Sequence, residues 1–166
     1  MKLLHVLSSV LLLALCCSVA GAQQVYTNDK IDYVIELPST EWRVISEPDA
    51  ALEFVFGDRL EGHLKIRKEV VAAGTTASDL VQRDQDQRLR FLPGFVAGKE
   101  EKFAGRTNGV TTSFEFIKTG KPMLGRVYYL ETDNRTIFAL RFTGLRDKLA
   151  RIRNQTDSIA RSFKVK

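Results

Sequence analysis

The sequence predicts an α+β protein, built as an antiparallel meander β-sheet with helices packed on it. Short stretches of alternating apolar and polar residues follow one another and are separated by two-residue turn signals. Hairpin turns of this kind force neighbouring strands to run antiparallel. Helix signals occur only once in the middle of the chain and once at its end, and not after every strand as in a doubly wound fold.

Residues 1–22 are predicted to be an export signal. Lys2 supplies the positive start, an almost unbroken apolar run extends from Val6 to Cys17, and Ala20-Gly21-Ala22 offers small residues before a cleavage point at Gln23. The apolar run is about a dozen residues, shorter than the roughly 20 that cross a bilayer as a helix. We therefore expect an exported protein, periplasmic or extracellular after cleavage and not transmembrane.

Two other fates of the N-terminus stay open. The leader remains uncleaved as an anchor, or a lipid is attached at Cys16 or Cys17, although a lipidated bacterial cysteine normally follows a residue smaller than Leu15. Both cysteines of the chain lie in this leader, so the predicted mature chain forms no disulfide. The full sequence is 44% hydrophobic, which is typical of a globular protein, and residues 23–166 show no linker or repeat, which indicates one domain.

The first half of the mature chain predicts strands and then a helix. Val25 to Leu37 is predicted to form a strand pair or one bent strand that Pro38 stops, and a short strand is predicted to carry Trp42. A hairpin joins 52–56 to 63–70. Thr76-Ala77-Ser78-Asp79 matches a capping box and opens a helix that runs to about Leu92, where Pro93-Gly94 ends it.

The second half predicts four more strands, at residues 95–103, 109–118, 123–131 and 135–142, with turns at Gly120-Lys121 and Asp133-Asn134. A single helix is predicted from Leu145 to Phe163. Its apolar stripe recurs at steps of three and four residues, through Leu145, Leu149, Ile152, Thr156, Ile159 and Phe163.

The two turns predict which side chains share a sheet face. Phe114 then lies opposite Val127, and Tyr129 opposite Phe138, on one apolar face that the closing helix covers. The predicted apolar face consists of Phe114, Phe116, Val127, Tyr129, Phe138, Leu140 and Phe142.

The opposite face is predicted to carry a row of charges. Glu115 faces Arg126, Arg126 faces Arg141, and Tyr128 lies beside them. A solvated charge ladder is the default interpretation, because cross-strand pairs of this kind are common. The alternative is a ligand site in which Glu115 neutralises one arginine and the other takes a carboxylate or phosphate.

The residues that enzymes and metal sites need are sparse. The predicted mature chain has one histidine, His63, which is expected to point outward, and it has no cysteine, so a zinc site of the usual ligands cannot be assembled. No Gly-x-Ser-x-Gly elbow, phosphate loop or calcium loop occurs. We expect no enzyme, no cofactor and no metal, although a hydrolase using carboxylates alone stays open.

Basic residues become frequent toward the C-terminus but spread around the closing helix. Nucleic-acid binding would need a concentrated patch with aromatic residues between the charges, so we do not expect it. A weak attraction to anionic lipid headgroups or to an acidic partner fits this distribution better.

The chain resembles the PsbP-like/DcrB-like family of small exported domains. The similarity rests on Tyr26-Thr27-Asn28, the run Ile31-Asp32-Tyr33-Val34-Ile35-Glu36-Leu37-Pro38, Trp42, and the closing helix that ends Ser162-Phe163-Lys164. The resemblance implies an antiparallel sheet sandwiched between helices, an α/β/α sandwich. It also implies a non-enzymatic accessory or assembly protein, with no catalytic residue.

Together these observations predict an exported, non-enzymatic accessory protein of the cell envelope that binds a protein partner or an envelope component. An exposed aromatic patch around Trp42 is the expected partner surface. The alternative is a carrier of a small ligand or anion, using the open sheet face with Arg126, Arg141, Glu115 and Tyr128.

Overall fold

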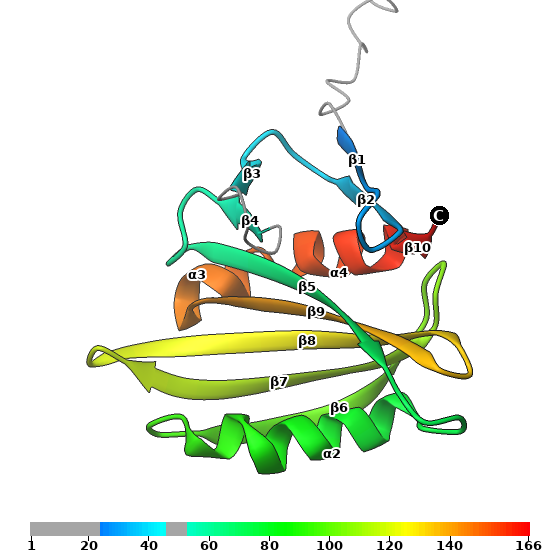
Figure 1. Ribbon diagram of the computed structural model, residues 1–166. Coiled ribbons are helices and arrows are strands. Elements are labelled where there is room, and N and C mark those ends of the chain that lie inside the picture. Colours follow the sequence, from blue (N-terminus) through cyan, green and yellow to red (C-terminus); the bar gives the residue numbers. More distant parts are fainter. Residues whose placement is uncertain (1–23, 46–52) are drawn as a thin grey trace, which may run out of the picture.

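The computed structural model describes residues 24–45 and 53–166, which form two antiparallel sheets and a set of helices (Figure 1). The predicted leader, residues 1–22, lies outside the described residues. The small sheet has the order β1-β2-β10 and the large sheet the order β3-β4-β5-β9-β8-β7-β6. The predicted α+β class and its antiparallel pairing are confirmed.

The strands of the small sheet are β1 (Gln24–Asn28), β2 (Tyr33–Leu37) and β10 (Lys164–Val165). The strands of the large sheet are β3 (Trp42–Ile45), β4 (Glu53–Phe56), β5 (Gly62–Val70), β6 (Val96–Phe103), β7 (Gly109–Lys118), β8 (Lys121–Asp133) and β9 (Thr136–Leu145). The helices are α2 (Ala77–Gln87), a 3₁₀ turn η1 (Leu89–Phe91), α3 (Arg146–Arg151) and α4 (Arg153–Ser162).

Helix α2 begins at the predicted capping box. The Asp79 amide donates a hydrogen bond to Oγ1 of Thr76 at 3.2 Å, and the Thr76 amide donates one to Oδ2 of Asp79 at 2.8 Å. These reciprocal bonds satisfy two amides that the first helical turn leaves without partners. Leu80 and Val81 on the inner side of α2 are buried in a core that includes Tyr129.

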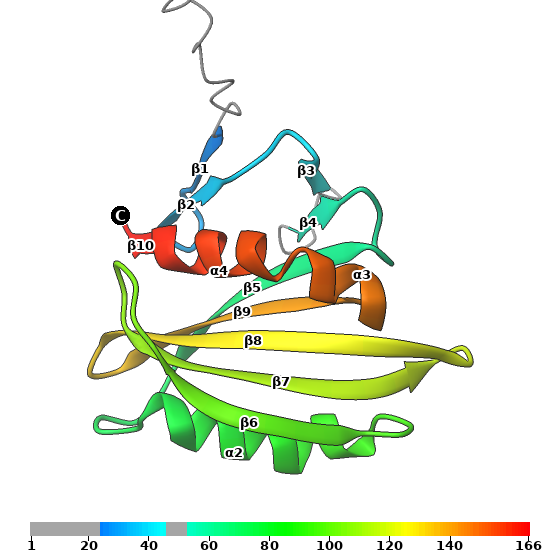
Figure 2. The ribbon, with the colours of Figure 1, turned by 180° about the vertical axis from the view of Figure 1, so that it is seen from behind.

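The predicted closing helix is two helices. The chain turns at Ile152, whose φ is −98° and ψ is 17°, so α3 ends there and α4 sets off in a new direction. The predicted stripe is confirmed from Leu149 onward, since Leu149, Ile152, Thr156, Ile159 and Phe163 are all buried. Its first member, Leu145, is instead the last residue of β9 and packs against the core beneath α2. Viewed from behind, α3 and α4 lie on one side of the large sheet and α2 on the other (Figure 2).

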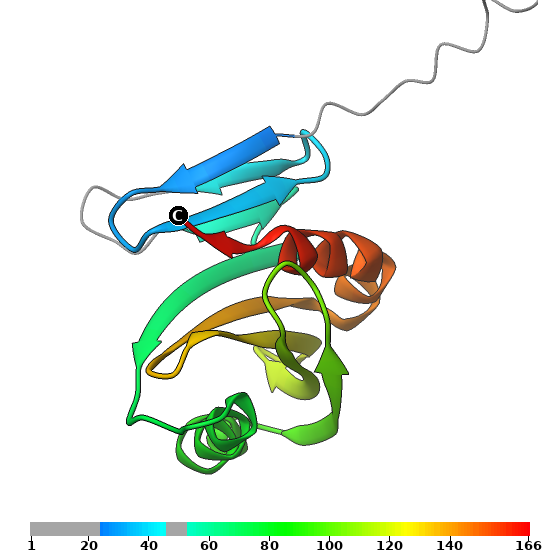
Figure 3. The same ribbon diagram turned by 90° about the vertical axis from the view of Figure 1, so that its right-hand side faces the viewer.

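The large sheet therefore buries both faces, which Figure 3 shows with the curved sheet between α2 and α4. The first core, beneath α4 and the small sheet, includes Tyr33, Trp42, Tyr128, Phe138, Leu140, Phe142 and Phe163. The second core, beneath α2, includes Leu80, Leu89, Phe114, Phe116, Val127, Tyr129 and Ala139. The prediction of one apolar face was wrong, because its residues divide between these two cores.

The reason is the register of β8 against β9. Their turn lies at Asn134-Arg135, with Asp133 opposite Thr136, which displaces the pairing by two residues from the prediction; a bulge between Glu131 and Asp133 then takes back one residue and leaves a net shift of one. A shift of an odd number of residues turns a strand's side chains to the other face. Arg126 consequently lies opposite Phe142, and Arg141 lies opposite Val127.

The turn between β7 and β8 also differs from the prediction, without the same consequence. It falls at Thr119-Gly120, where both residues have positive φ, so Phe114 lies opposite Gly125. This displacement is two residues, and an even shift keeps every side chain on its predicted face. Phe114 and Val127 thus still share a face.

Candidate functional site

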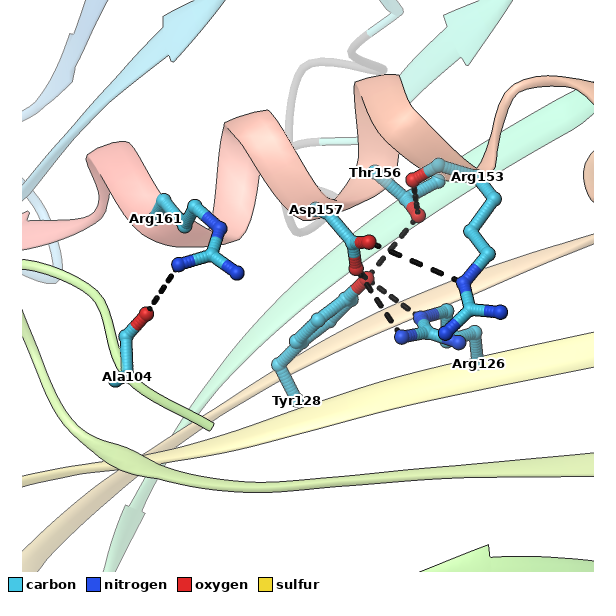
Figure 4. Close-up of polar contacts among 7 residues, drawn as sticks. All are labelled: Ala104, Arg126, Tyr128, Arg153, Thr156, Asp157 and Arg161. Atoms are coloured by element: carbon cyan, nitrogen blue, oxygen red, sulfur yellow. Dashed lines mark hydrogen bonds and ion pairs between the residues drawn. The ribbon is translucent and has the colours of Figure 1, made fainter. Parts of the chain in front are cut away.

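Arg126 is held in a polar network between β8 and α4. Its Nε donates a hydrogen bond to Oη of Tyr128 at 2.6 Å, and its Nη2 lies 3.1 Å from Oδ1 of Asp157 (Figure 4). Tyr128 Oη also donates to Asp157 and lies 3.1 Å from Oγ1 of Thr156. The carboxylate of Asp157 already neutralises Arg126, so this arginine is not a free anion receptor.

Burial raises the pKa of the Tyr128 hydroxyl, and the neighbouring Asp157 carboxylate raises it further. The phenol therefore stays protonated and serves as a hydrogen-bond donor. The sequence analysis placed Tyr128 beside Arg126 but did not include Asp157. The available signal was its position, because Asp157 directly follows Thr156, a residue of the predicted buried stripe.

Glu115 lies apart from Arg126. It is exposed, and its Oε2 lies 3.5 Å from Nη1 of Arg146 at the start of α3. The predicted Glu115–Arg126–Arg141 row does not form. The two-residue shift between β7 and β8 places Glu115 opposite Leu124, and the odd shift between β8 and β9 turns Arg141 to the other face.

Arg141 lies on the opposite face, beneath α2. Its guanidinium carbon is 5.2 Å from the ring centroid of Phe114, and its Nε is buried without a hydrogen-bond acceptor. Within residues 24–45 and 53–166, no carboxylate forms an ion pair with it. Burial lowers the pKa of this guanidinium, with partial compensation from Tyr129 and Asp84.

A cavity of about 210 Å³ adjoins Arg141 between α2 and the sheet. Its apolar wall is made by Leu89, Val127, Tyr129 and Ala139, and its charged residues are Lys65, Arg67, Asp84, Arg88 and Arg141. Ile66 borders the cavity too, but its side chain belongs to the core on the other face of the sheet. The side chain of Asp84 is committed elsewhere: its Oδ2 accepts from Tyr129 Oη at 2.9 Å and from Arg67 Nη2 at 3.0 Å.

A wider groove of about 780 Å³ lies on the same face, beyond the end of α2. Four basic side chains line it (Arg59, Lys65, Lys118 and Arg141), together with one acidic side chain, Glu53. Its apolar residues are Leu60, Leu92, Pro93, Phe116, Ile117 and Met123. Leu60 and Ile117 are 38% and 40% exposed, and Phe91, two residues before Pro93, is 68% exposed.

His63 lines this groove but does not point freely outward as predicted. Its Nε2 lies 2.7 Å from Oε2 of Glu53, which also pairs with Lys65. Burial lowers the pKa of His63, and the Glu53 carboxylate only partly offsets that shift. The imidazole is therefore a neutral partner of Glu53 at neutral pH.

Trp42 has no exposed ring to offer a partner. It is 1% exposed, its Nε1 donates a hydrogen bond to Oε1 of Gln155 at 2.9 Å, and its ring meets those of Phe56 and Phe142. The predicted aromatic surface patch around Trp42 was wrong, because α4 covers the face on which Trp42 lies.

The basic residues of the closing helices are largely engaged with the rest of the protein. Lys148 Nζ lies 2.8 Å from Glu61, Arg153 lies 3.9 Å from Asp157, and Arg161 donates to the Ala104 carbonyl at 2.8 Å. Because these contacts engage the basic side chains within the protein, they leave less free positive charge for attraction to an anionic lipid surface.

Among the residues that the structure describes, no group of three or more His, Cys, Asp or Glu side chains is placed to hold a metal ion. Across residues 24–45 and 53–166, no helix has the length and apolar character needed to span a membrane.

Several solved structures share this arrangement, while no protein-family model and no curated protein sequence matches the chain. Cyanobacterial PsbP (CyanoP) from Synechocystis superposes with a TM-score of 0.59 at 16% identity, over 91% of this chain and 96% of that one. LpqN of Mycobacterium tuberculosis, described as involved in cell envelope biogenesis, gives 0.57 at 14% identity, over 87% and 90%.

The Ran-binding protein Mog1p of Saccharomyces cerevisiae gives a TM-score of 0.61 at 9% identity, over 87% of this chain and 96% of that one. The chain therefore has the PsbP-like α+β fold, as its resemblance to that family implied. Function is a separate question, since a shared fold carries many functions.

Proposed function

We propose that this protein is an exported, non-enzymatic accessory protein of the cell envelope, and that its groove binds an extended segment of a partner protein. The carrying observation is the groove of about 780 Å³ beyond the end of α2, where Leu60 and Ile117 remain partly exposed. Apolar surface rimmed by charge is typical of protein interaction sites.

The charge of the groove specifies the partner. The groove is lined by four basic side chains and one acidic side chain, and that acidic residue, Glu53, is already paired with Lys65 and His63. An acidic segment with apolar anchors would complement both the charge and the apolar floor. Two proteins of the same fold, the Ran-binding protein Mog1p and LpqN, which is involved in cell envelope biogenesis, have roles consistent with this proposal.

Site-specific photo-crosslinking tests this proposal. Ile117 is replaced by a photoreactive phenylalanine derivative, and the protein is irradiated with a cell-envelope fraction. Val25, which is 68% exposed on the small sheet, is replaced in the same way as a matched control. We expect a discrete crosslinked partner only from position 117, and we expect Leu60→Asp to abolish it.

Equal crosslinking from positions 25 and 117 would remove the groove as the partner site. Turnover of a substrate by the purified protein, lost on a single substitution, would contradict the non-enzymatic role. The N-terminal residue of the protein recovered from the envelope tests export, and cleavage at Ala22-Gln23 places Gln23 first. Limited proteolysis that leaves residues 23–166 intact would support the single domain.

A second candidate function is binding of a small anion. The specific observation in its favour is Arg141, whose buried Nε has no acceptor in the described structure. This version differs from the predicted open-face site, because Arg126 is neutralised by Asp157 and lies on the other side of the sheet.

A further inference from the structure

We infer that the cavity beneath α2 binds a small organic carboxylate with a compact apolar body, and that Arg141 pairs with its carboxylate group. This inference rests on the second candidate function and adds to it a location and a class of ligand. The inference is based on the position of Arg141, an arginine without an ion-pair partner among the described residues, at the edge of a largely apolar cavity of about 210 Å³.

Arg141 is fixed in place by its strand and by Phe114. It sits in β9, between Lys65 of β5 and Val127 of β8, and the Phe114 ring lies against its guanidinium. A planar guanidinium held on one side presents its remaining N–H groups in a fixed fork. Such a fork matches the two oxygens of a carboxylate.

The acids around the cavity do not supply that carboxylate. Asp84 accepts from Tyr129 and Arg67, and its Oδ1 lies 3.6 Å from Nη1 of Arg88. Glu53, at the adjoining groove, is shared by His63, Lys65 and Arg59. Arg141 is partly exposed, but its buried Nε has no acceptor in the described part of the chain. A buried N–H without an acceptor is unfavourable, and an anion bound from solvent would supply the missing acceptor.

The size and lining of the cavity define the rest of the ligand. An apolar cavity of about 150 Å³ is sufficient to hold benzene, and this one is about 210 Å³. Val127, Ala139 and Leu89 provide an apolar wall for a ring or a short branched chain. The other basic residues at the site, Lys65, Arg67 and Arg88, favour an anion over a neutral ligand.

The cavity and the groove are neighbours, because Lys65 and Arg141 line both of them. These two cations attract a carboxylate toward the cavity.

Calorimetric titration with benzoate, together with ¹H–¹⁵N NMR mapping, tests the inference. We expect benzoate to bind at up to millimolar concentration and to shift the signals of Val127, Tyr129 and Ala139. We expect Arg141→Gln to weaken binding at least about tenfold, the scale set by a charge-assisted hydrogen bond. Benzyl alcohol, which has the ring without the charge, is expected to bind much more weakly.

Arg106→Gln is the matched control. Arg106 is half-exposed and pairs with Glu36 at 2.8 Å on the α4 side, away from the cavity. Its substitution is expected to leave benzoate binding unchanged. If Arg141→Gln fails to fold, Arg141→Lys keeps the charge but loses the fork, and it is likewise expected to weaken binding.

Ala139→Leu provides an independent test, because it fills the cavity while leaving Arg141 in place. We expect it to lose benzoate binding. The inference is overturned if the native protein binds no benzoate, if Arg141→Gln binds it as well as native, or if benzyl alcohol binds equally. If the native protein binds no benzoate but still crosslinks from position 117, this inference fails and the partner proposal stands.

Discussion

The indole Nε1 of Trp42 donates a hydrogen bond of 2.9 Å to Oε1 of Gln155, and this bond ties the edge strand β3 to helix α4. Ser39 Oγ donates to the same amide oxygen at 3.3 Å. Among the described strands of the large sheet, β3 is an edge strand that pairs with β4 alone. The bond from Trp42 to Gln155 therefore adds support to a strand that has a neighbour on one side only.

Replacing Trp42 by Phe should therefore destabilise the protein. The substitution removes the indole N–H that donates to Gln155 and leaves part of a buried site empty. Together these losses should lower the free energy of unfolding by about 1–3 kcal/mol. Urea denaturation measures the loss. Val44→Ala, on the same strand but 39% exposed, is the control and should change stability little. Equal losses from the two substitutions would show that the indole contact is not special.

The Tyr128–Asp157 contact should be energetically coupled. Tyr128→Phe removes a buried donor between β8 and α4, and Asp157→Asn removes the charge that also pairs with Arg126. We expect each substitution to destabilise by about 1–3 kcal/mol. The double variant should lose less than the sum of the two single variants. Strict additivity in a thermal or urea double-mutant cycle would argue against the network.

Gly125 should tolerate no side chain while Phe114 covers it. A Cβ placed on Gly125 would lie 2.1 Å from Cζ of Phe114, directly across the β7–β8 pair. We expect Gly125→Ala to cost about 1–3 kcal/mol through overpacking. Phe114→Leu should be destabilising alone. The double variant with Gly125→Ala should lose less stability than the sum of the two single variants, because the smaller side chain leaves room for the new Cβ. Additive losses in denaturation experiments would mean that the ring does not move aside.

Stability should fall in two stages as the pH is lowered from neutral. The first stage belongs to His63, because burial lowers its pKa in the folded protein below the ordinary 6.5. Below pH 6.5 the unfolded state binds the proton first, so the contribution of the neutral imidazole is lost as the pH falls toward the folded pKa. His63→Gln should remove this stage in pH-dependent melting curves.

The second stage belongs to Glu53. Burial raises the pKa of its carboxyl, but hydrogen bonds from Lys65 and His63 outweigh that effect, so the pKa lies below the ordinary 4.5. A carboxyl with a depressed pKa stabilises the fold above 4.5 and loses that contribution as the pH falls through its folded pKa. Glu53→Gln should reduce this stage. If Glu53→Gln melts with the same pH dependence as the native protein below pH 4.5, Glu53 is not the source of the second stage.

The sequence was sufficient to define the elements because their signals are local. The Thr76–Asp79 capping box, the breaks at Pro38 and Pro93, and the alternating strands each depend on residues close together in the chain. The buried stripe from Leu149 to Phe163 was also correctly identified, even though the helix that carries it bends at Ile152.

The candidate site could not be obtained in the same way, because it depends on register. A single bulge near Glu131 sends Arg141 to the α2 face and leaves Arg126 facing α4, and no local signal in the sequence marks that extra residue. The burial of Trp42 depends on α4, more than a hundred residues further along the chain. Long-range contacts of this kind decided which polar groups found partners and which did not.

The sequence by itself thus determined the order of strands and helices and the apolar residues from which two cores are built. Only the tertiary structure decided which arginine is neutralised and which remains unpaired beside a cavity. The physical reason is that periodicity fixes the relative orientation of side chains along one strand, whereas the pairing between strands fixes the face on which each strand's side chains come to lie.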